Sequence, residues 1–214
     1  LYGYAHVPWM SKRQVMIDGT ALPSAEARFE LTDMAQRMLR LDGFLPIGID
    51  HFARPGDSLA VAAHSGGLRR NFQGYTDDQA KVLIGLGASA ISQFPQGYVQ
   101  NHAATAAYTS AIGQGRLAGA RGHVLSDADR LTARMIEQLM CSFAIEAQAL
   151  AVEFPDQGAT VAGAVAALVA AYPDACRSDG TGLQIVDGFA PLVRVMAGHL
   201  DHYRAGQMAH SSAI

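Results

Sequence analysis

The feature that most constrains the fold is the order of patterns in the first fifty residues. Residues 1–7 form an aromatic and β-branched run that is typical of a strand. Apolar residues then recur at helical spacing over residues 24–41, and Gly43 follows them as a C-terminal cap. A second apolar run over residues 46–52 predicts another strand. Strand, helix and strand in this order indicate a βαβ unit and an α/β fold.

The start of the chain also bears on its extent. A domain rarely begins within a core strand, and the predicted strand starts at Leu1. We therefore expect further residues to precede this chain in the complete protein. A sheet cut at that strand exposes unpaired backbone groups and an apolar face, so we expect the isolated chain to be poorly soluble or loosely folded.

The character of the sequence changes near residue 123. Ser126 can cap a helix with one apolar face. Further elements follow it: an alanine-rich helix over about residues 159–171, a strand over 182–186 and a helix over about 189–204. This order resembles a winged-helix module. The sequence therefore predicts two units, an α/β part over residues 1–123 and a mainly helical domain over residues 124–214.

Composition excludes several classes of protein. Half of the 214 residues are hydrophobic and 16% are charged, which indicates a packed globular core. The formal net charge of -3 gives no basic surface for phosphates, and the apolar run over residues 161–172 is too short to span a bilayer. We expect neither a nucleic-acid nor a membrane partner. Cys141 and Cys176 lack partners at metal-ligand spacing, which predicts no metal site and favours the reducing cytoplasm.

Asp50 and His51 are the candidate catalytic residues. They lie at the C-terminal end of the second predicted strand, and active sites of β/α arrays gather at the C-terminal ends of strands. A histidine beside a carboxylate can donate a proton or bind a ligand. The alternative is a structural hydrogen-bonded pair.

The polar segment over residues 68–76 is the best candidate for binding an anion. Its donors and acceptors surround an aromatic residue, a composition suited to recognising carboxylates. The candidate substrate-binding residues are Arg69, Arg70, Gln73 and Tyr75. The alternative is a solvated connecting loop.

A glycine motif over residues 85–90 matches the GxGxxA form of a dinucleotide fingerprint. That fingerprint needs a helix to begin within it, and Pro95 leaves no room for one. Two interpretations remain. Either small residues let the backbone approach a ligand closely, or the motif is a tight turn packed for steric reasons.

Four segments resemble the oxygen-independent coproporphyrinogen III oxidases, a radical S-adenosylmethionine family. They are YAHVP at residues 4–8, GIDHFARP at 48–55, RNFQGYT at 70–76 and GLGASAIS at 85–92. The resemblance is strongest over about residues 1–145 and is one of layout beyond them. It implies that the chain is the C-terminal half of such an enzyme, with the last part of a partial (β/α) barrel followed by a mainly helical domain.

The resemblance also implies cofactors. Members of the family hold a 4Fe-4S cluster on a CxxxCxxC loop and two S-adenosylmethionine molecules. This sequence has no CxxxCxxC, so the cluster ligands are absent from the chain and the fragment alone is expected to be inactive. Carried over by motif position, Ala5 contacts the second S-adenosylmethionine and Ile91 the first.

The activity that the resemblance implies is the oxidative decarboxylation of coproporphyrinogen III to protoporphyrinogen IX in haem biosynthesis. A 5'-deoxyadenosyl radical abstracts hydrogen from a propionate, and loss of carbon dioxide and one electron leaves a vinyl group. The complete enzyme is expected to be a cytoplasmic monomer with an unidentified electron donor. The alternatives are a haem-binding paralogue and a non-catalytic remnant; Asp50, His51 and residues 71–76 follow the oxidase pattern.

Overall fold

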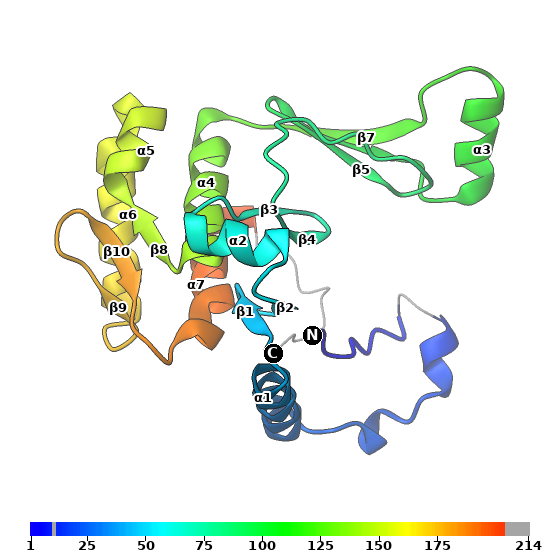
Figure 1. The fold of residues 1–214 in the computed structure, drawn as a ribbon. Coiled ribbons are helices and arrows are strands. Elements are labelled where there is room, and N and C mark those ends of the chain that lie inside the picture. The colour runs from blue at the N-terminus through cyan, green and yellow to red at the C-terminus, as the bar shows by residue number, and fades with distance from the viewer. Residues whose placement is uncertain (10–11, 204–214) are drawn as a thin grey trace.

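The computed structural model describes residues 1–9 and 12–203 (Figure 1). Its α-helices are α1 (Ala25–Leu41), α2 (Ser58–Ser65), α3 (Thr105–Gly113), α4 (Asp127–Ser142), α5 (Ala147–Glu153), α6 (Gly158–Ala171) and α7 (Val193–Leu200). Its strands are β1 (Leu45–Ile47), β2 (His51–Ala53), β3 (Arg69–Asn71), β4 (Gly74–Thr76), β5 (Ile91–Phe94), β6 (Gly97–Asn101), β7 (Gly119–Val124), β8 (Ala144–Glu146), β9 (Cys176–Arg177) and β10 (Gly182–Ile185). Short 3-10 helices are η1 (Lys12–Met16), η2 (Gly19–Ala21), η3 (Pro155–Gln157) and η4 (Ala190–Leu192). None of the helices within the described residues is long and apolar enough to cross a bilayer.

The predicted strand over residues 1–7 is wrong for this chain. The segment has no regular secondary structure, and no strand of the described residues pairs with it. A strand is defined by its hydrogen-bonded neighbour, so β propensity alone does not make one. The Leu1 backbone nitrogen donates a hydrogen bond to the carbonyl of Asp50, so the segment lies beside the turn that precedes β2.

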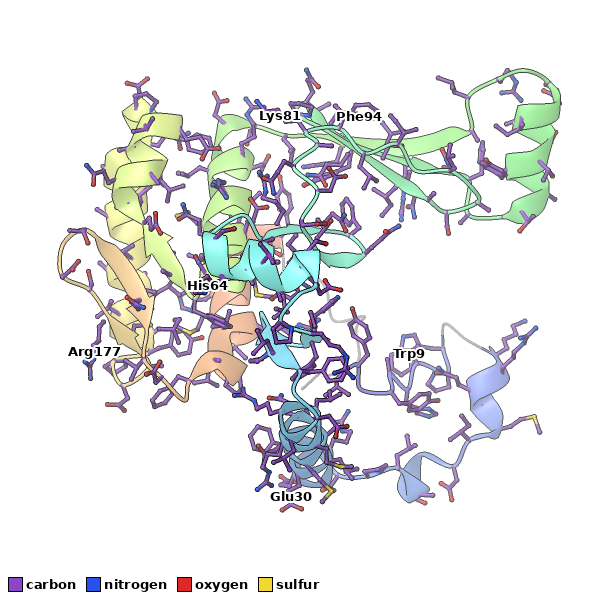
Figure 2. All side chains as sticks on the ribbon, in the orientation of Figure 1. Trp9, Glu30, His64, Lys81, Phe94 and Arg177 are labelled. Atoms are coloured by element: carbon purple, nitrogen blue, oxygen red, sulfur yellow. The ribbon has the colours of Figure 1, made fainter. Side chains whose placement is uncertain are left out.

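Helix α1 begins and ends as predicted. The hydroxyl of Ser24 accepts a hydrogen bond from the Ala27 amide at 3.2 Å, and Gly43 follows the helix with a φ of +81°. No residue of α1 is buried, and its side chains project freely in Figure 2. A stripe at helical spacing, here called the α1 stripe, stays more than half exposed: Leu31, Met34, Met38 and Leu41.

The predicted strand over residues 46–52 is instead a hairpin. Strands β1 and β2 pair antiparallel, with Ile47 opposite His51, and Gly48 turns the chain between them with a φ of +57°. All paired strands of the described residues are antiparallel, so the βαβ interpretation is wrong. The chain has a mixed fold of helices and small antiparallel sheets. Asp50 lies in the turn and His51 begins β2, so the two residues do not lie at the C-terminal end of one strand as predicted.

The next hairpins also differ from the prediction. Residues 68–76 are not an open loop but the hairpin β3–β4, in which Arg70 is opposite Tyr75. Before β5, Leu83 makes an isolated antiparallel bridge to Gln93, and Ser89, with a φ of +61°, turns the chain. Strands β5, β6 and β7 form one antiparallel sheet, which Figure 1 shows as an arm extending to α3.

The helices predicted beyond residue 123 are confirmed. Helices α4 to α7 pack with the three-stranded sheet β8–β10–β9, and the core includes Leu139, Leu150, Leu168 and Met196, each fully buried. The last helix ends at Leu200, and residue 204 of its predicted range lies outside the described residues.

Asp129 is expected to make stability fall in acid. Its carboxylate is buried and accepts hydrogen bonds from the Ser126 hydroxyl at 2.7 Å and the Ser126 amide at 2.8 Å. These bonds, helped by the charge of His123, lower the pKa of Asp129 to about 2. His202 also faces the carboxylate, at 3.4 Å. Because the pKa is lower in the folded state than in the unfolded chain, at about 3.9, the stabilisation is complete above that pH and is lost as pH falls toward 2.

Urea unfolding at several pH values would test this expectation. The difference in unfolding free energy between the wild type and Asp129→Asn should be largest near neutral pH and should shrink between pH 4 and about pH 2. Ser126→Ala removes the main cause of the shift and serves as the matched variant, and we expect it to shrink the same difference. A difference in unfolding free energy between wild type and Asp129→Asn that is the same at every pH would contradict the prediction.

Candidate functional site

Tyr75 is the centre of a polar cluster between the two hairpins and α4. Its side chain is 7% exposed, donates a hydrogen bond to the Met140 carbonyl at 2.9 Å and accepts one from the Ile49 amide at 3.3 Å. Burial raises the pKa of Tyr75 above its usual value, so it stays a neutral phenol. Its ring lies against the turn at Gly48, where an added Cβ would meet it at 2.0 Å. Tyr75 therefore fixes the position of β1–β2 relative to β3–β4 and α4.

Asp50 and His51 form a half-buried pair beside this tyrosine. The His51 Nδ1 atom lies 2.6 Å from the Asp50 carboxylate, and the two side chains are 24% and 12% exposed. The Nε2 atom faces the Tyr2 hydroxyl at 3.5 Å. Gly74 makes room for the ring, because a Cβ there would lie 2.7 Å from Nε2. The carboxylate thus orients the imidazole, and Nε2 is the atom that can give or take a proton.

The two adjacent arginines of β3 have different surroundings. The Arg69 Nε atom donates to Glu137 of α4 at 2.7 Å, so its charge is neutralised. The Arg70 guanidinium stacks over the Tyr75 ring at 4.8 Å and makes no hydrogen bond within the described residues; its Nη1 atom is buried and unpaired. Arg70 is therefore the cation of this segment that is free to bind a ligand.

A chain of ion pairs supports this arrangement from α4. Glu137 accepts a hydrogen bond from Arg134 at 2.8 Å, and Arg134 also donates to Glu153 at 2.9 Å. Sequence patterns do not single out Glu137 or Arg134, because a spacing of three on a helix is common for surface ion pairs. Tyr2 is not singled out by the sequence either, because it lies within the strand predicted over residues 1–7. Gln73 lies exposed at the hairpin turn, and its backbone amide donates a hydrogen bond to the Asn71 side chain at 2.8 Å.

The remaining predicted site residues lie elsewhere. Ala5 is exposed in the N-terminal segment, and its carbonyl accepts a hydrogen bond from Gln14 at 3.1 Å. Ile91 is partly buried at the start of β5 in the arm (Figure 1). No described contact joins Ala5 to Ile91. Among the described residues there is also no group of three histidine, cysteine or acidic side chains that could bind a metal ion.

The glycine motif over residues 85–90 is a turn whose backbone groups already have partners. The Gly85 amide donates to the Ser92 hydroxyl at 3.0 Å, and the Gly87 amide donates to the Tyr108 hydroxyl at 3.1 Å. The Asn101 amide donates to the carbonyls of Gly85 and Gly87 at 3.1 and 3.0 Å. No helix starts within the motif, as its sequence predicts. The structure thus favours a packed turn over a dinucleotide site.

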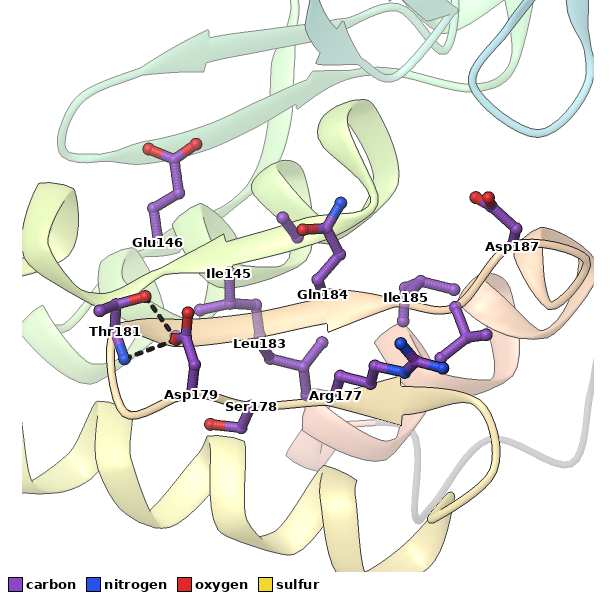
Figure 3. A pocket seen from close by; sticks show the side chains of 13 residues that line it. Ile145, Glu146, Arg177, Ser178, Asp179, Thr181, Leu183, Gln184, Ile185 and Asp187 are labelled. Atoms are coloured by element: carbon purple, nitrogen blue, oxygen red, sulfur yellow. Dashed lines mark hydrogen bonds between the residues drawn. The ribbon is translucent and has the colours of Figure 1, made fainter.

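Two hollows lie near the surface. The larger, of about 820 Å³, follows the sheet β8–β10–β9, and Figure 3 shows that Glu146, Asp187 and Arg177 carry its charges while Asp179 is bound to Thr181. The smaller, of about 260 Å³, lies between β3–β4 and residues 80–84. Its lining includes Arg69, Arg70 and Lys81, with Asp78 as the acid, so it carries a net positive charge.

Cys141 is expected to react slowly with alkylating reagents. Burial, with the negative charge of Glu137, raises the pKa of this thiol to about 12. Because the thiolate is the nucleophile, only about one thiol in ten thousand is ionised at pH 8. Alkylation by iodoacetamide at pH 8, followed by peptide mass spectrometry, should show Cys141 modified far more slowly in the folded protein than in urea. Equal rates in both conditions would contradict the assignment.

No family model matches the chain. It is 49% identical over 214 residues to the oxygen-independent coproporphyrinogen III oxidase of Paracoccus denitrificans and 47% identical to that of Cereibacter sphaeroides, covering all of this chain and 48% and 47% of those proteins. A solved structure of coproporphyrinogen III oxidase from Escherichia coli, described as a radical SAM enzyme, superposes with a TM-score of 0.85 and 32% identity, covering 94% of this chain and 46% of that one.

The chain thus spans about half the length of the curated relatives it matches. The similarity is present in both sequence and structure, and it extends beyond the four motifs to nearly every described element. Over its whole length, this chain resembles one half of the oxygen-independent coproporphyrinogen III oxidases.

Proposed function

We propose that the complete protein, of which this chain is the C-terminal half, converts coproporphyrinogen III to protoporphyrinogen IX by oxygen-independent oxidative decarboxylation. The observation that carries the proposal is the match along all 214 residues at 49% identity to a protein of that name. The polar cluster around Tyr75 lies within two of the four matching segments. We propose that the complete protein is a cytoplasmic monomer. An unidentified reductant would supply its electrons.

The residues of this chain do not fit an iron-sulfur cluster. Such clusters need several cysteine thiolates at one place, and the sequence has two cysteines. Cys176 is buried in the helical core, whereas Cys141 lies near Arg70 with a raised pKa. We therefore assign the cluster ligands to the preceding half. For the two S-adenosylmethionine molecules, we propose that Ala5 contacts the second and Ile91 the first.

The residues of this chain would bind and orient the substrate. We propose Asp50 and His51 as the proton-handling pair, because Asp50 holds Nδ1 while Nε2, which faces the Tyr2 hydroxyl, can exchange a proton. We propose that hairpin β3–β4 faces the substrate carboxylates. In that hairpin the arginines carry the charge, Tyr75 positions them, and Gln73 is free at the turn.

The α1 stripe supports a role for the preceding half. A surface helix of a globular protein normally buries its apolar face, yet Met34, Met38 and Leu41 are exposed in this chain. We propose that a neighbouring helix or sheet of the preceding half covers the α1 stripe and pairs with residues 1–7. Residues 1–123 would then complete the barrel, and residues 124–214 would form the helical domain.

Anaerobic assay of the complete protein tests the proposal. The full reading frame would be expressed, reconstituted with iron and sulfide, and supplied with S-adenosylmethionine, a reductant and coproporphyrinogen III. Mass spectrometry should detect protoporphyrin after oxidation of the product. The control is the same protein with the cysteines of its cluster motif replaced by alanine, which should give no product. Tight haem binding without turnover would instead support the haem-binding paralogue.

A further inference from the structure

The smaller hollow beside hairpin β3–β4 has the properties of a carboxylate site. Three cationic residues, Arg69, Arg70 and Lys81, line it against one acid, Asp78. Polar groups of Thr76 and Gln93 add hydrogen-bonding capacity. Its volume of about 260 Å³ suits a short side chain with a charged end and not a whole porphyrinogen.

The cations of this hollow differ in availability. Arg69 is bound to Glu137 at 2.7 Å. The Arg70 guanidinium has no hydrogen-bond partner in the described residues, and the Lys81 ammonium forms no ion pair or hydrogen bond there. An unpaired buried guanidinium nitrogen is destabilising, and a carboxylate ligand would give it a hydrogen-bond partner. The hollow therefore has two unpaired cations, of which Arg70 is the rigid one and Lys81 the flexible one.

Arg70 is held in place before any ligand arrives. Its guanidinium stacks on Tyr75, whose hydroxyl is tied to the Met140 carbonyl. Glu137 accepts a hydrogen bond from the Arg70 amide at 3.4 Å while it also binds Arg69. This arrangement keeps Arg69 from competing and limits the side-chain entropy lost when Arg70 binds a carboxylate. Figure 2 shows Lys81 at the upper end of the segment that leads to β5.

Resting on the proposed function, we propose that this hollow binds a propionate of coproporphyrinogen III that is retained in the product, with Arg70 as the anchor and Lys81 as the second cation. A reacting propionate loses its charge as carbon dioxide leaves. A cation pair on that group would stabilise the ground state more than the transition state and would slow the reaction. On a retained propionate the same pair binds both states equally and fixes the ring.

The test uses the complete, reconstituted enzyme. Four variants are compared with wild type: Arg70→Gln, Arg70→Lys, Lys81→Gln and, as the matched control, Arg116→Gln, which removes an exposed arginine that contacts Gln114 near α3. KM and kcat would be measured with coproporphyrinogen III and with its monovinyl, tripropionate intermediate. Binding of S-adenosylmethionine and thermal unfolding are measured alongside.

Arg70→Gln should raise KM about 10- to 100-fold with kcat changed less than about threefold, because a charge-assisted hydrogen bond to a ligand is lost. Lys81→Gln should raise KM by less, Arg70→Lys should recover part of the loss, and Arg116→Gln should match wild type. The increase in KM should be the same for both substrates, since a retained propionate is present in each.

Other outcomes overturn the inference. One such outcome is the same KM for Arg70→Gln, Lys81→Gln and the control Arg116→Gln. That result would show that the hollow binds no carboxylate. An effect on coproporphyrinogen III but not on the tripropionate intermediate would show that the bound propionate is one that reacts. If Arg70→Gln unfolds, Lys81→Gln decides, because Lys81 is exposed. A wild-type enzyme with no turnover would refute the proposed function instead.

Discussion

Replacing Gly48 with alanine is expected to lower the free energy of unfolding by about 2–5 kcal/mol. Two effects add. The φ of +57° is a left-handed conformation that strains any residue with a Cβ atom, and the new Cβ would lie 2.0 Å from the Tyr75 ring. The ring has no room to move, because its hydroxyl is bound to the Met140 carbonyl and the Ile49 amide.

Gly43→Ala is the matched control for this prediction. Gly43 has a φ of +81°, but nothing lies within 4 Å of its added Cβ. It therefore carries the backbone strain alone, of about 1–2 kcal/mol. Urea unfolding followed by circular dichroism would measure both variants. Equal losses for Gly43→Ala and Gly48→Ala would show that the packing of Tyr75 against the turn contributes nothing.

The 214-residue chain by itself is expected to have no measurable coproporphyrinogen turnover, a loss of many orders of magnitude relative to the complete protein. The chain has two cysteines, and they lie in different parts of the fold, so it cannot supply a CxxxCxxC loop. Without a cluster, the reductive step that forms the radical has no electron carrier. After treatment with iron and sulfide, absorption spectra should show no cluster on the isolated chain.

Adding back the preceding half provides the control. The two halves would be produced as separate polypeptides and mixed under reconstitution conditions. The α1 stripe should then become protected from oxidation at Met34 and Met38, which peptide mass spectrometry can follow. Turnover by the isolated chain would contradict the prediction. Unchanged methionine oxidation in a mixture that has turnover would contradict the assignment of the α1 stripe to the interface between the halves.

Local signals in the sequence were enough to place the helices. Ser24 and Ser126 each cap a helix at its predicted start, because a cap is a bond between a side chain and an amide three residues away. The spacing of residues within one or two helical turns predicts the apolar face of α4 and the alanine-rich helix α6. The family resemblance also came from contiguous segments, and full-length relatives confirmed it.

Strand pairing and the chemistry of the site needed the tertiary structure. Residues 46–52 have the composition of one strand, but Gly48 turns them into two. Arg69 and Arg70 are equivalent in the sequence, and only the approach of Glu137, which is 68 residues away from Arg69, neutralises one and leaves the other free. Helix caps depend on neighbours in the chain, so the sequence by itself determines them. Strand partners, burial and ion pairs depend on groups that folding brings together from distant positions, and only the folded chain decides them.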